Sequence, residues 1–312
     1  MTSDREATSD RDAEFDHDAE TAIVTGATGG VGSWVVDRLA DRGVEVVGID
    51  LERPEGTRAN ATFRAVDLRE QAPTWESIHE IDPDAIVHCA GIADPFETPS
   101  TRVFENNTMS AYNVLVAAGR AGVDVVWTSS QASYGALFAD GERVPDFLPV
   151  DEGHERRPAD AYGLSKLCGE EIAKSVARRD GASVTTIRPA TIFAPDSRRT
   201  RPPRETDDLS ADDVGGNFGS YVDVRDVCRL VEAALATDVE GHETVLCAAD
   251  ENYLGRPTAE LVGIVCGELP DDCDLEGRQA ALSNAKAERV FDWTPAYEWH
   301  DLEEEAAGPD WT

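Results

Sequence analysis

Lysine is almost absent from this chain of 312 residues. Only Lys166, Lys174 and Lys286 occur, and 28 basic residues stand against 62 acidic ones, which gives a formal net charge of −34. Such a negative field repels nucleic acid and anionic membrane surfaces, so we expect neither as a partner. An acidic, lysine-poor surface is typical of a protein adapted to high salt, where the Debye length falls to about 3 Å at 1 M salt.

Paired cysteines and long apolar runs are also lacking. The cysteines form no C-x-x-C pair and most stand among apolar residues, so we expect buried reduced thiols, with neither a metal site nor a disulfide framework. They are Cys89, Cys168, Cys228, Cys247, Cys266 and Cys273. The N-terminus carries Asp and Glu in place of a basic region followed by an apolar one, and no apolar run approaches membrane-spanning length. The sequence thus predicts a soluble cytoplasmic protein.

A glycine-rich stretch, TGATGGVG at 25–32, stands between an apolar run and a helix-like run. In such a turn between strand and helix, Gly26 supplies the bend, Gly29 lets the backbone approach a pyrophosphate and Gly32 allows close helix-to-sheet packing. The helix N-terminus then offers free N–H groups and a positive dipole end to the phosphates. Glycines also serve plain turns, but a second strand ends in Asp50, where a ribose-binding carboxylate is expected. The stretch therefore predicts a dinucleotide fold.

Strand and helix signals alternate along most of the chain, which favours an α/β fold with a Rossmann-like, doubly wound parallel sheet. Short apolar runs predict its strands at 22–24, 44–49, 62–66, 85–89, 123–127 and 184–187. Helical patterns occupy 74–81, 99–121, 160–179, 223–236, 258–267 and 284–291, with one further strand at 244–248. We expect a disordered acidic tail at 1–20, a dinucleotide-binding domain at 21–188 and a small C-terminal substrate lobe at 189–312.

The strongest second signal is YGLSK at 162–166. On a helix, positions four apart share one face, so the Tyr162 hydroxyl and the Lys166 ammonium can converge. A nearby cation favours phenolate and lowers a pKa of about 10 towards that of a general base. A half-exposed Tyr and Lys on an amphipathic helix would show the same spacing. The retention of a lysine here, in a chain that has nearly discarded lysine, favours the catalytic interpretation.

Ser130 ends the fifth strand, and substrates of open α/β sheets lie at the carboxyl ends of strands. Its hydroxyl can donate to a carbonyl or carbinol oxygen and hold it beside Tyr162. A serine that merely satisfies a strand end is the plainer alternative. Gln131, the next residue, can hydrogen-bond a substrate hydroxyl or can be a solvated polar side chain.

Taken together and in order, the motifs resemble the extended short-chain dehydrogenase/reductases, the NAD-dependent epimerase/dehydratase group. The resemblance covers about residues 21 to 298. The motifs are TGATGGVG, Asp50, VDL at 66–68, HCAG at 88–91, ENNTMSAYNVL around Asn107, SSQASYG at 129–135, YGLSK, RPATIFAP at 188–195, YVDVRDV at 221–227 and a late NAKAERVFDWTP.

The resemblance implies a role for each matching residue. The base would be Tyr162, Lys166 would bind the nicotinamide ribose, Ser130 would bind the substrate oxygen and Asn107 would support the active site. NAD would be the cofactor, with NADP as the alternative. Its binding residues would be Gly26, Gly29, Gly30, Val31, Gly32, Asp50, Asp67, Leu68, Ala90, Tyr162 and Lys166. Substrate would contact Ser130, Gln131 and Tyr162, and the family resemblance leads us to expect a homodimer.

Two departures from the family pattern bear on function. Ser110-Ala111 replaces the usual Gly-Thr, a mild change on a helix. RPATIFAP carries no Asn, whereas the nucleotide-sugar members of the family usually carry one in this segment. Only the 25 residues 196–220 separate Pro195 from Tyr221, which leaves little protein to build a nucleotide pocket.

We therefore expect a sugar dehydrogenase that oxidises a free aldose or uronic acid at C1 to a lactone. The alternatives are a nucleotide-sugar epimerase or dehydratase with tightly bound NAD, and a non-catalytic NAD-binding sensor. The sensor is disfavoured because it need not keep the base and its activator. The cluster Arg198, Arg199, Arg201 and Arg204 could clamp a diphosphate, bind a carboxylate or balance the acidic stretch that follows, and we favour the last.

Overall fold

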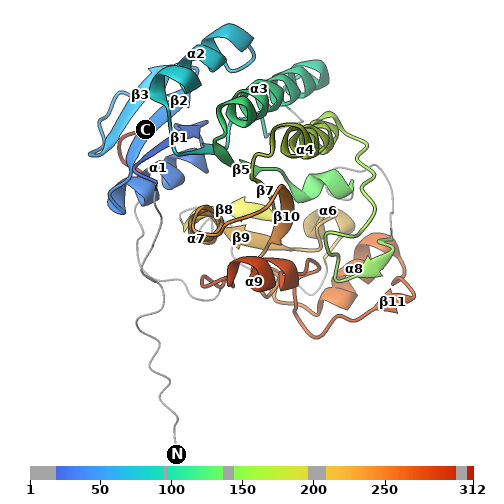
Figure 1. Cartoon of the computed structure of the whole chain (residues 1–312). Helices are drawn as coiled ribbons and strands as arrows, with labels where there is room; N and C mark the ends of the chain where they lie inside the picture. The colour runs from blue at the N-terminus through green and yellow to red at the C-terminus, as the bar shows by residue number, and fades with distance from the viewer. Residues whose placement is uncertain (1–18, 94–96, 136–143, 196–208, 300–307) are drawn as a thin grey trace, which may run out of the picture.

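A computed structural model describes residues 19–93, 97–135, 144–195, 209–299 and 308–312. Its centre is a seven-stranded sheet within these residues, in the order β10-β7-β5-β4-β1-β2-β3 (Figure 1). Every neighbouring pair in this sheet is parallel. The chain order reverses between β1 and β4, and in open α/β sheets ligands bind outside the carboxyl ends of the strands at such a point. The predicted Rossmann-like α/β class is confirmed.

The strands lie where the apolar runs predict them, within a few residues at each end. They are β1 (Thr21–Thr25), β2 (Glu45–Asp50), β3 (Ala61–Ala65), β4 (Ala85–His88), β5 (Asp124–Thr128), β7 (Val184–Pro189) and β10 (His242–Cys247). All four residues of β4 and all six of β7 are buried. Burial on both faces explains why β4 begins with an apolar run that does not alternate, whereas β7 also buries Thr185, Thr186 and Arg188.

Helices cover both faces of the sheet. On one face α2 (Gln71–Ile81), α3 (Ser100–Ala121) and α4 (Ala161–Asp180) lie side by side, with α3 and α4 in extensive contact (Figure 1). On the other, α1 (Gly32–Asp41) packs against α7 (Val224–Leu235), which also contacts α9 (Ala285–Phe291). None of the described helices combines the length and the apolar content that a membrane crossing requires.

Short elements lie outside the central sheet, most of them in the segment 189–312 that is expected to form the C-terminal lobe, and among them the sequence predicts only the helix at 258–267. They are β6 (Phe147–Leu148) paired with β11 (Asp272–Cys273), β8 (Thr191–Phe193) paired with β9 (Tyr221–Asp223), α6 (Ala211–Val214) and α8 (Thr258–Cys266). The strand expected in this lobe at 244–248 is instead β10, which pairs along β7 at the edge of the central sheet. The sheet thus draws a strand from beyond residue 188, because an apolar run does not specify its pairing partner.

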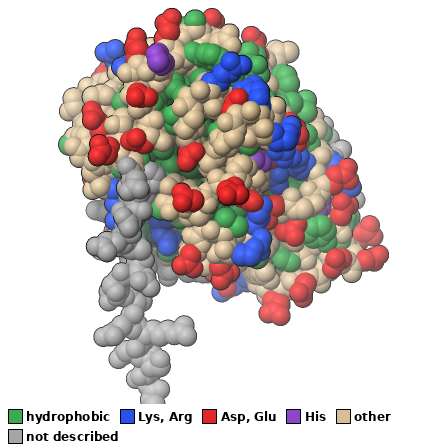
Figure 2. All heavy atoms as spheres, viewed as in Figure 1, with side chains coloured by type: hydrophobic (Ala, Val, Ile, Leu, Met, Phe, Trp, Pro, Cys, Tyr) green, Lys and Arg blue, Asp and Glu red, His purple; other side chains and the backbone are tan. Residues whose placement is uncertain are grey.

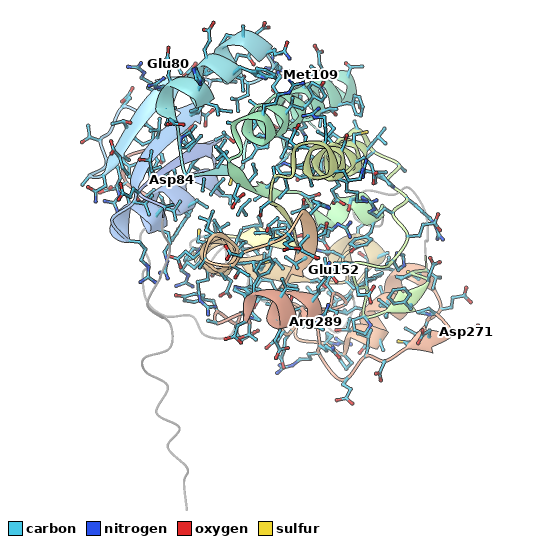
Figure 3. All side chains as sticks on the ribbon, viewed as in Figure 1. Glu80, Asp84, Met109, Glu152, Asp271 and Arg289 are labelled. Atoms are coloured by element: carbon cyan, nitrogen blue, oxygen red, sulfur yellow. The ribbon has the colours of Figure 1, made fainter. Side chains whose placement is uncertain are left out.

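Two contacts tie distant parts of the chain to the sheet. Glu152, labelled in Figure 3, lies beside β10, where its Oε1 accepts a hydrogen bond from the backbone N–H of Leu246 (2.7 Å). Near the C-terminus, the buried ring of Trp311 lies 4.9 Å from that of Phe63 on β3, and its Nε1 donates to Asp37 on α1 (2.6 Å). The last residues of the chain therefore pack against the first half of the dinucleotide domain.

The distribution of acidic side chains and the burial of the cysteines can be compared with what the composition predicts. Asp and Glu side chains are spread over the whole face seen in Figure 2 and do not gather in one patch. All six cysteines are free; Cys228, Cys247 and Cys266 are buried as expected, whereas Cys89, Cys168 and Cys273 are only partly buried. The acidic tail expected at 1–20 lies almost wholly outside the described residues, which begin at residue 19.

Candidate functional site

The glycine-rich turn joins β1 to α1 at the point where the strand order reverses. Gly26 has φ +66°, and a Cβ there would lie 2.8 Å from the backbone of Ala90. A Cβ on Gly32 would lie 2.1 Å from the Gly26 carbonyl oxygen. A side chain at either position would therefore separate the first turn of α1 from the sheet, which is the packing that the sequence predicts for Gly32.

The acidic residue at the end of β2 faces this turn. Asp50 Oδ2 accepts hydrogen bonds from the backbone N–H (3.0 Å) and the hydroxyl (2.8 Å) of Thr28. Its Oδ1 accepts from the backbone N–H of Leu51 (2.7 Å). These bonds fix the carboxylate beside the helix N-terminus. Asp67, expected near adenine, is bound through both carboxylate oxygens by the side chain of Arg69, which holds the Asp67 pKa below its ordinary value.

A cleft of about 840 Å³ opens over the carboxyl ends of the strands. Its walls include every residue that the sequence assigns to the cofactor: Gly26, Gly29, Gly30, Val31, Gly32, Asp50, Asp67, Leu68, Ala90, Tyr162 and Lys166. Ser130 and Gln131 line it as well. The volume lies within the range of about 300–1,000 Å³ that is typical of ligand sites. Gly29 and Gly30 carry no side chain where the turn lines the cleft, and the space beside Gly30 is open, which fits a dinucleotide pyrophosphate.

Other residues of the cleft were not singled out by the sequence analysis. They are Thr28, Arg69, Arg102, Asn106, Pro189, Thr191 and Ile192, among others. Thr28 lies inside the glycine motif and Pro189, Thr191 and Ile192 lie in RPATIFAP, so both motifs carried the signal without assigning it to single residues. Arg69 and Arg102 had no such signal.

Tyr162 and Lys166 lie one turn apart near the start of α4. Asp160 caps this helix, since its Oδ1 accepts from the backbone N–H of Gly163 (2.8 Å). The buried Lys166 Nζ lies 5.5 Å from the centroid of the Tyr162 ring and donates to the carbonyl oxygen of Thr128 (2.8 Å). The two side chains thus lie on one face of α4, and the convergence of the hydroxyl with the ammonium stays a prediction.

The predicted direction of the Tyr162 pKa shift is wrong for this arrangement. Burial of the phenol raises its pKa above 10, a hydrogen bond with Ser130 opposes that shift, and the charge of Asp160 adds to it. Burial also lowers the pKa of Lys166 to about 8, against the opposing effects of Cys89 and Glu170. The sequence argument weighed the cation alone, whereas desolvation is the larger effect on both groups.

Ser130 and Gln131 stand between β5 and the short 3₁₀ helix η2 (Gln131–Tyr134). Ser130 Oγ accepts from the backbone N–H of Ala132 (3.1 Å) and is hydrogen-bonded with Tyr162. Gln131 is only 5% exposed, and within the described part of the chain its Nε2 has no hydrogen-bond partner. An unpaired buried amide is costly in a folded protein, so this N–H₂ group is the most direct sign of a ligand at the site.

Asn107 lies behind the cleft and does not line it. Its Oδ1 accepts from the backbone N–H of Ile92 (2.7 Å), and its Nδ2 donates to the Ile92 carbonyl (3.0 Å) and to Ser165 Oγ (3.3 Å). It therefore joins the loop after β4 to helix α4 between Tyr162 and Lys166. This position agrees with a supporting role.

A buried ionic network underlies the same strand ends. The Glu170 carboxylate, one turn after Lys166, accepts from Arg188 through Nε (2.9 Å) and Nη2 (2.6 Å) and from Ser129 Oγ (2.7 Å). Arg188 also donates to the hydroxyl of Tyr134 (2.7 Å). Burial would raise the Glu170 pKa, but the hydrogen bonds and charge of Arg188 hold it below its ordinary value. The network fixes the residue before Ser130 and the end of η2, and the sequence analysis did not find it.

Two further sequence predictions concern the arginine cluster and metal binding. The arginines at 198, 199, 201 and 204 lie outside the described residues. Among the residues that are described, no group of three His, Cys, Asp or Glu side chains could hold a metal ion.

The chain is similar to a known protein family and to individual proteins within it. The family model described as "NAD dependent epimerase/dehydratase family" matches residues 22–248. A UDP-glucose 4-epimerase of Streptococcus mutans is 32% identical over 175 residues, which are 53% of this chain and 50% of that protein. A uronate dehydrogenase of Pseudomonas putida is 26% identical over 282 residues, covering 88% of this chain and 92% of that one. The match to the first of these thus spans only half of the relative's length.

A solved structure shares the fold over most of its length. The UDP-glucose 4-epimerase of Thermotoga maritima, solved with UDP-glucose, aligns with a TM-score of 0.68 and 21% identity over 90% of this chain and 96% of that one.

Proposed function

The chain belongs to the NAD-dependent epimerase/dehydratase family, and from that premise we propose that it oxidises a free sugar, an aldose or a uronic acid, at C1 to the lactone. NAD is the cofactor of this family, and it would occupy the cleft between the glycine turn and Lys166. When bound, it supplies the acceptor for the hydride that leaves C1. The carboxylate of Asp50 at the end of β2 favours NAD over NADP, because it can accept from a ribose 2′-OH and would repel a 2′-phosphate.

In this proposal the protein's own groups handle the proton. Ser130 donates to the oxygen on C1 and holds it beside Tyr162, and the Tyr162 oxygen accepts the hydroxyl proton. Because burial raises the Tyr162 pKa, the base needs every neighbour that favours phenolate. With substrate bound, the single Ser130 proton goes to the C1 oxygen, so the Lys166 ammonium, 5.5 Å from the ring centroid, is the neighbour that would favour phenolate.

The observation that carries the choice of a free sugar is the small volume of the cavity beside Gln131, which adjoins the cleft that Ser130, Tyr162 and Lys166 line. The cavity that adjoins Gln131 measures about 60 Å³, whereas sites for drug-sized ligands take about 300–1,000 Å³. The connection between β8 and β9 is also short, with 25 residues from 196 to 220 between Pro195 and Tyr221. Both features support a substrate without a nucleoside diphosphate.

A nucleotide-sugar epimerase is the second candidate, and the names of the relatives favour it. In that reaction the cofactor is reduced and reoxidised within one turnover, so reduced NAD does not accumulate. The two candidates separate by absorbance of reduced nicotinamide with free aldoses, uronic acids and UDP-sugars offered separately. Net reduction with free sugars supports the dehydrogenase, and product from a UDP-sugar without net reduction supports the epimerase.

Calorimetric titration of the NAD-loaded protein with UDP gives an independent check. We expect no binding, because the cavity beside Gln131 measures only about 60 Å³. Tight binding of UDP would replace the dehydrogenase by the epimerase.

We further propose a homodimer. Met109 and Tyr112 on α3 and Leu164 on α4 are exposed, although all three are large and apolar, and Met109 is labelled in Figure 3. Because α3 and α4 lie side by side, these side chains suit an interface between two copies. Light scattering in high salt tests this, and a monomer at micromolar concentration would refute it.

A further inference from the structure

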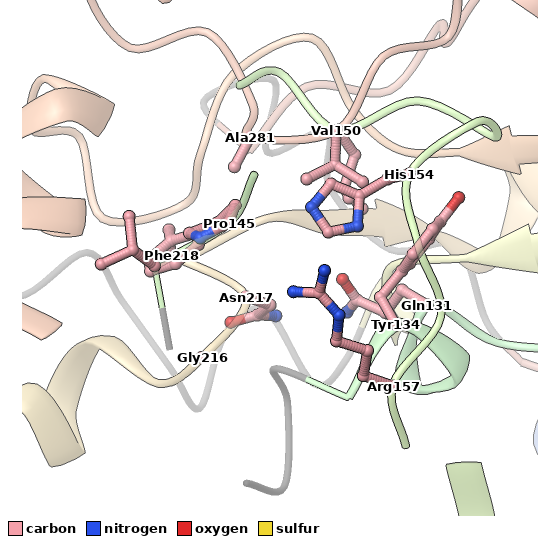
Figure 4. Close-up of a pocket in the computed structure, with 12 residues that line it drawn as sticks. Gln131, Tyr134, Pro145, Val150, His154, Arg157, Gly216, Asn217, Phe218 and Ala281 are labelled. Carbon is pink, nitrogen blue, oxygen red and sulfur yellow. The ribbon is translucent and has the colours of Figure 1, made fainter. Parts of the chain in front are cut away.

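A second cavity lies beside the cofactor cleft, and Gln131 lines both. Figure 4 shows it enclosed by η2, by the loop that carries His154 and Arg157, by the turn at Gly216–Phe218 and by Ala281. Its volume is about 60 Å³. Since one water needs about 10–15 Å³ by this measure, the cavity has room for only a few heavy atoms.

Most of its wall is hydrocarbon. Besides the ring of Tyr134, the apolar lining consists of Val144, Pro145, Val150, Phe218, Ala281 and Leu282. All but Val144 of these six are buried or nearly so in the folded chain. A group that enters this space exchanges water for methyl and ring contacts, which favours a C–H surface over a polar one.

The polar groups around the cavity are already satisfied within the protein. Arg157 donates to Asp146 (3.1 and 3.0 Å) and to Glu155 (2.9 Å), so one guanidinium faces two carboxylates. His154 Nε2 accepts from the backbone N–H of Asp146 (2.9 Å), and its Nδ1 bonds the Glu155 carbonyl (2.8 Å). Both ring nitrogens of His154 are therefore engaged within the protein.

Tyr134 and Asn217 are engaged in the same way. The Tyr134 hydroxyl donates to the Asp151 carbonyl (2.8 Å) and accepts from Arg188 (2.7 Å). Asn217 Nδ2 donates to Thr191 Oγ1 and to the Ser220 carbonyl, each at 2.7 Å. Gln131 Nε2 is the exception, being buried and unpaired. Among the described lining residues, the cavity therefore offers the unpaired Gln131 donor and a mostly apolar wall, in which the charged Arg157 is already paired with carboxylates.

Building on the proposed function, we propose that this cavity receives the end of the sugar remote from C1 and that it selects an uncharged end. The substrate class is then a neutral aldose, with a 6-deoxy sugar favoured, and uronic acids are excluded. Gln131 donates to a ring hydroxyl between the two cavities. A carboxylate in the same place would lose its hydration, meet no free cation and lie near Asp146 and Glu155.

The test uses sugars of one configuration that differ only at C6. D-fucose, D-galactose and D-galacturonate carry CH₃, CH₂OH and COO⁻ there, and 6-deoxyglucose, glucose and glucuronate form a second set. The readout is kcat/KM from the appearance of reduced NAD. We expect the 6-deoxy sugar to exceed the uronate by 10-fold or more within a set, since even a single methylene in an apolar pocket is worth about 10- to 200-fold. Equal values, or a preference for the uronate, would overturn the inference while leaving the dehydrogenase intact.

Two variants make the assignment specific. Leu282→Asn puts a polar group of similar size into the wall and is expected to erase the preference for CH₃ over CH₂OH, with the KM for NAD unchanged as a sign of an intact fold. Arg157→Gln is expected to leave the ratio between uronate and 6-deoxy sugar where it was. A selective loss of uronate turnover in Arg157→Gln would mean that Arg157 binds a carboxylate, and the inference would fall. If no sugar of either set reduces NAD although NAD binds, the proposed function itself fails.

Discussion

Replacing Glu170 by Gln removes the charge at the centre of the buried network and tests how that network supports the site. The Glu170 side chain is fully buried and that of Arg188 is 4% exposed. In Glu170→Gln the Arg188 guanidinium stays buried but loses its counter-ion. The single amide oxygen of the glutamine also cannot accept hydrogen bonds from Arg188, Arg156 and Ser129 together. Breaking a buried pair from one side costs about 3–5 kcal/mol. For a chain of this size that corresponds to a fall in Tm of roughly 5–8 °C.

Helix α4 offers a matched control in the next residue. Glu171 binds the same Arg156 (3.0 Å), but its side chain is 57% exposed. Glu171→Gln is therefore expected to change stability by less than about 0.5 kcal/mol. Urea unfolding at constant high salt measures both variants, because urea adds no ions.

The double variant Glu170→Gln/Arg188→Met removes the stranded cation and should recover part of the loss, since apolar replacements of buried pairs are often neutral. The wild-type contribution should also depend on pH. The folded pKa of Glu170 lies below its ordinary value, so its stabilisation is present above the unfolded pKa and disappears as pH falls through the folded pKa. Equal stabilities for Glu170→Gln and Glu171→Gln would refute the reasoning.

Four further outcomes follow from the site and the composition. Tyr162→Phe should lower kcat by about 10²- to 10⁴-fold while fluorescence titration still shows NAD binding, and Lys166→Met should weaken both; near-normal turnover in Tyr162→Phe would end the catalytic assignment. Asp50→Ser should narrow the preference for NAD over NADP, measured as a ratio of kcat/KM values, and a wild type that prefers NADP would contradict the role of Asp50. Urea midpoints should rise with KCl, because salt screens the net charge of −34, and a midpoint independent of salt would count against salt adaptation. Burial raises the pKa of Glu298 to about 7, so wild-type stability should fall as pH rises from about 4.5 to 7, and Glu298→Gln should flatten that slope in pH-dependent unfolding.

The parts of the fold that could be predicted are those with a local cause. The glycine turn, the buried strands and helix α4 each show their pattern within a few residues, and Gly26, Asp50, Tyr162 and Lys166 all line one cleft in the structure. The carboxyl ends of parallel strands share one edge of the sheet, so residues that follow different strands could be predicted from the sequence to lie close together.

What could not be predicted depends on contacts between distant residues. The apolar run of β10 does not say that it pairs with β7, and nothing around Trp311 indicates that its ring packs on Phe63. The raised Tyr162 pKa follows from burial, which a residue spacing does not measure. The cavity beside Gln131 is built from four separate segments, and only their packing makes it apolar.

The measurement that tests the central claim most directly is the fate of the hydrogen on C1. An aldose labelled with deuterium at C1 is incubated with the protein and excess NAD, and the reduced cofactor and the sugar product are analysed by mass spectrometry. The account predicts one deuterium in each reduced NAD, formed in equal amount to the lactone, and no such product from Tyr162→Phe. Reduced NAD without label would contradict the account, and so would an unreduced cofactor pool together with an epimerised UDP-sugar.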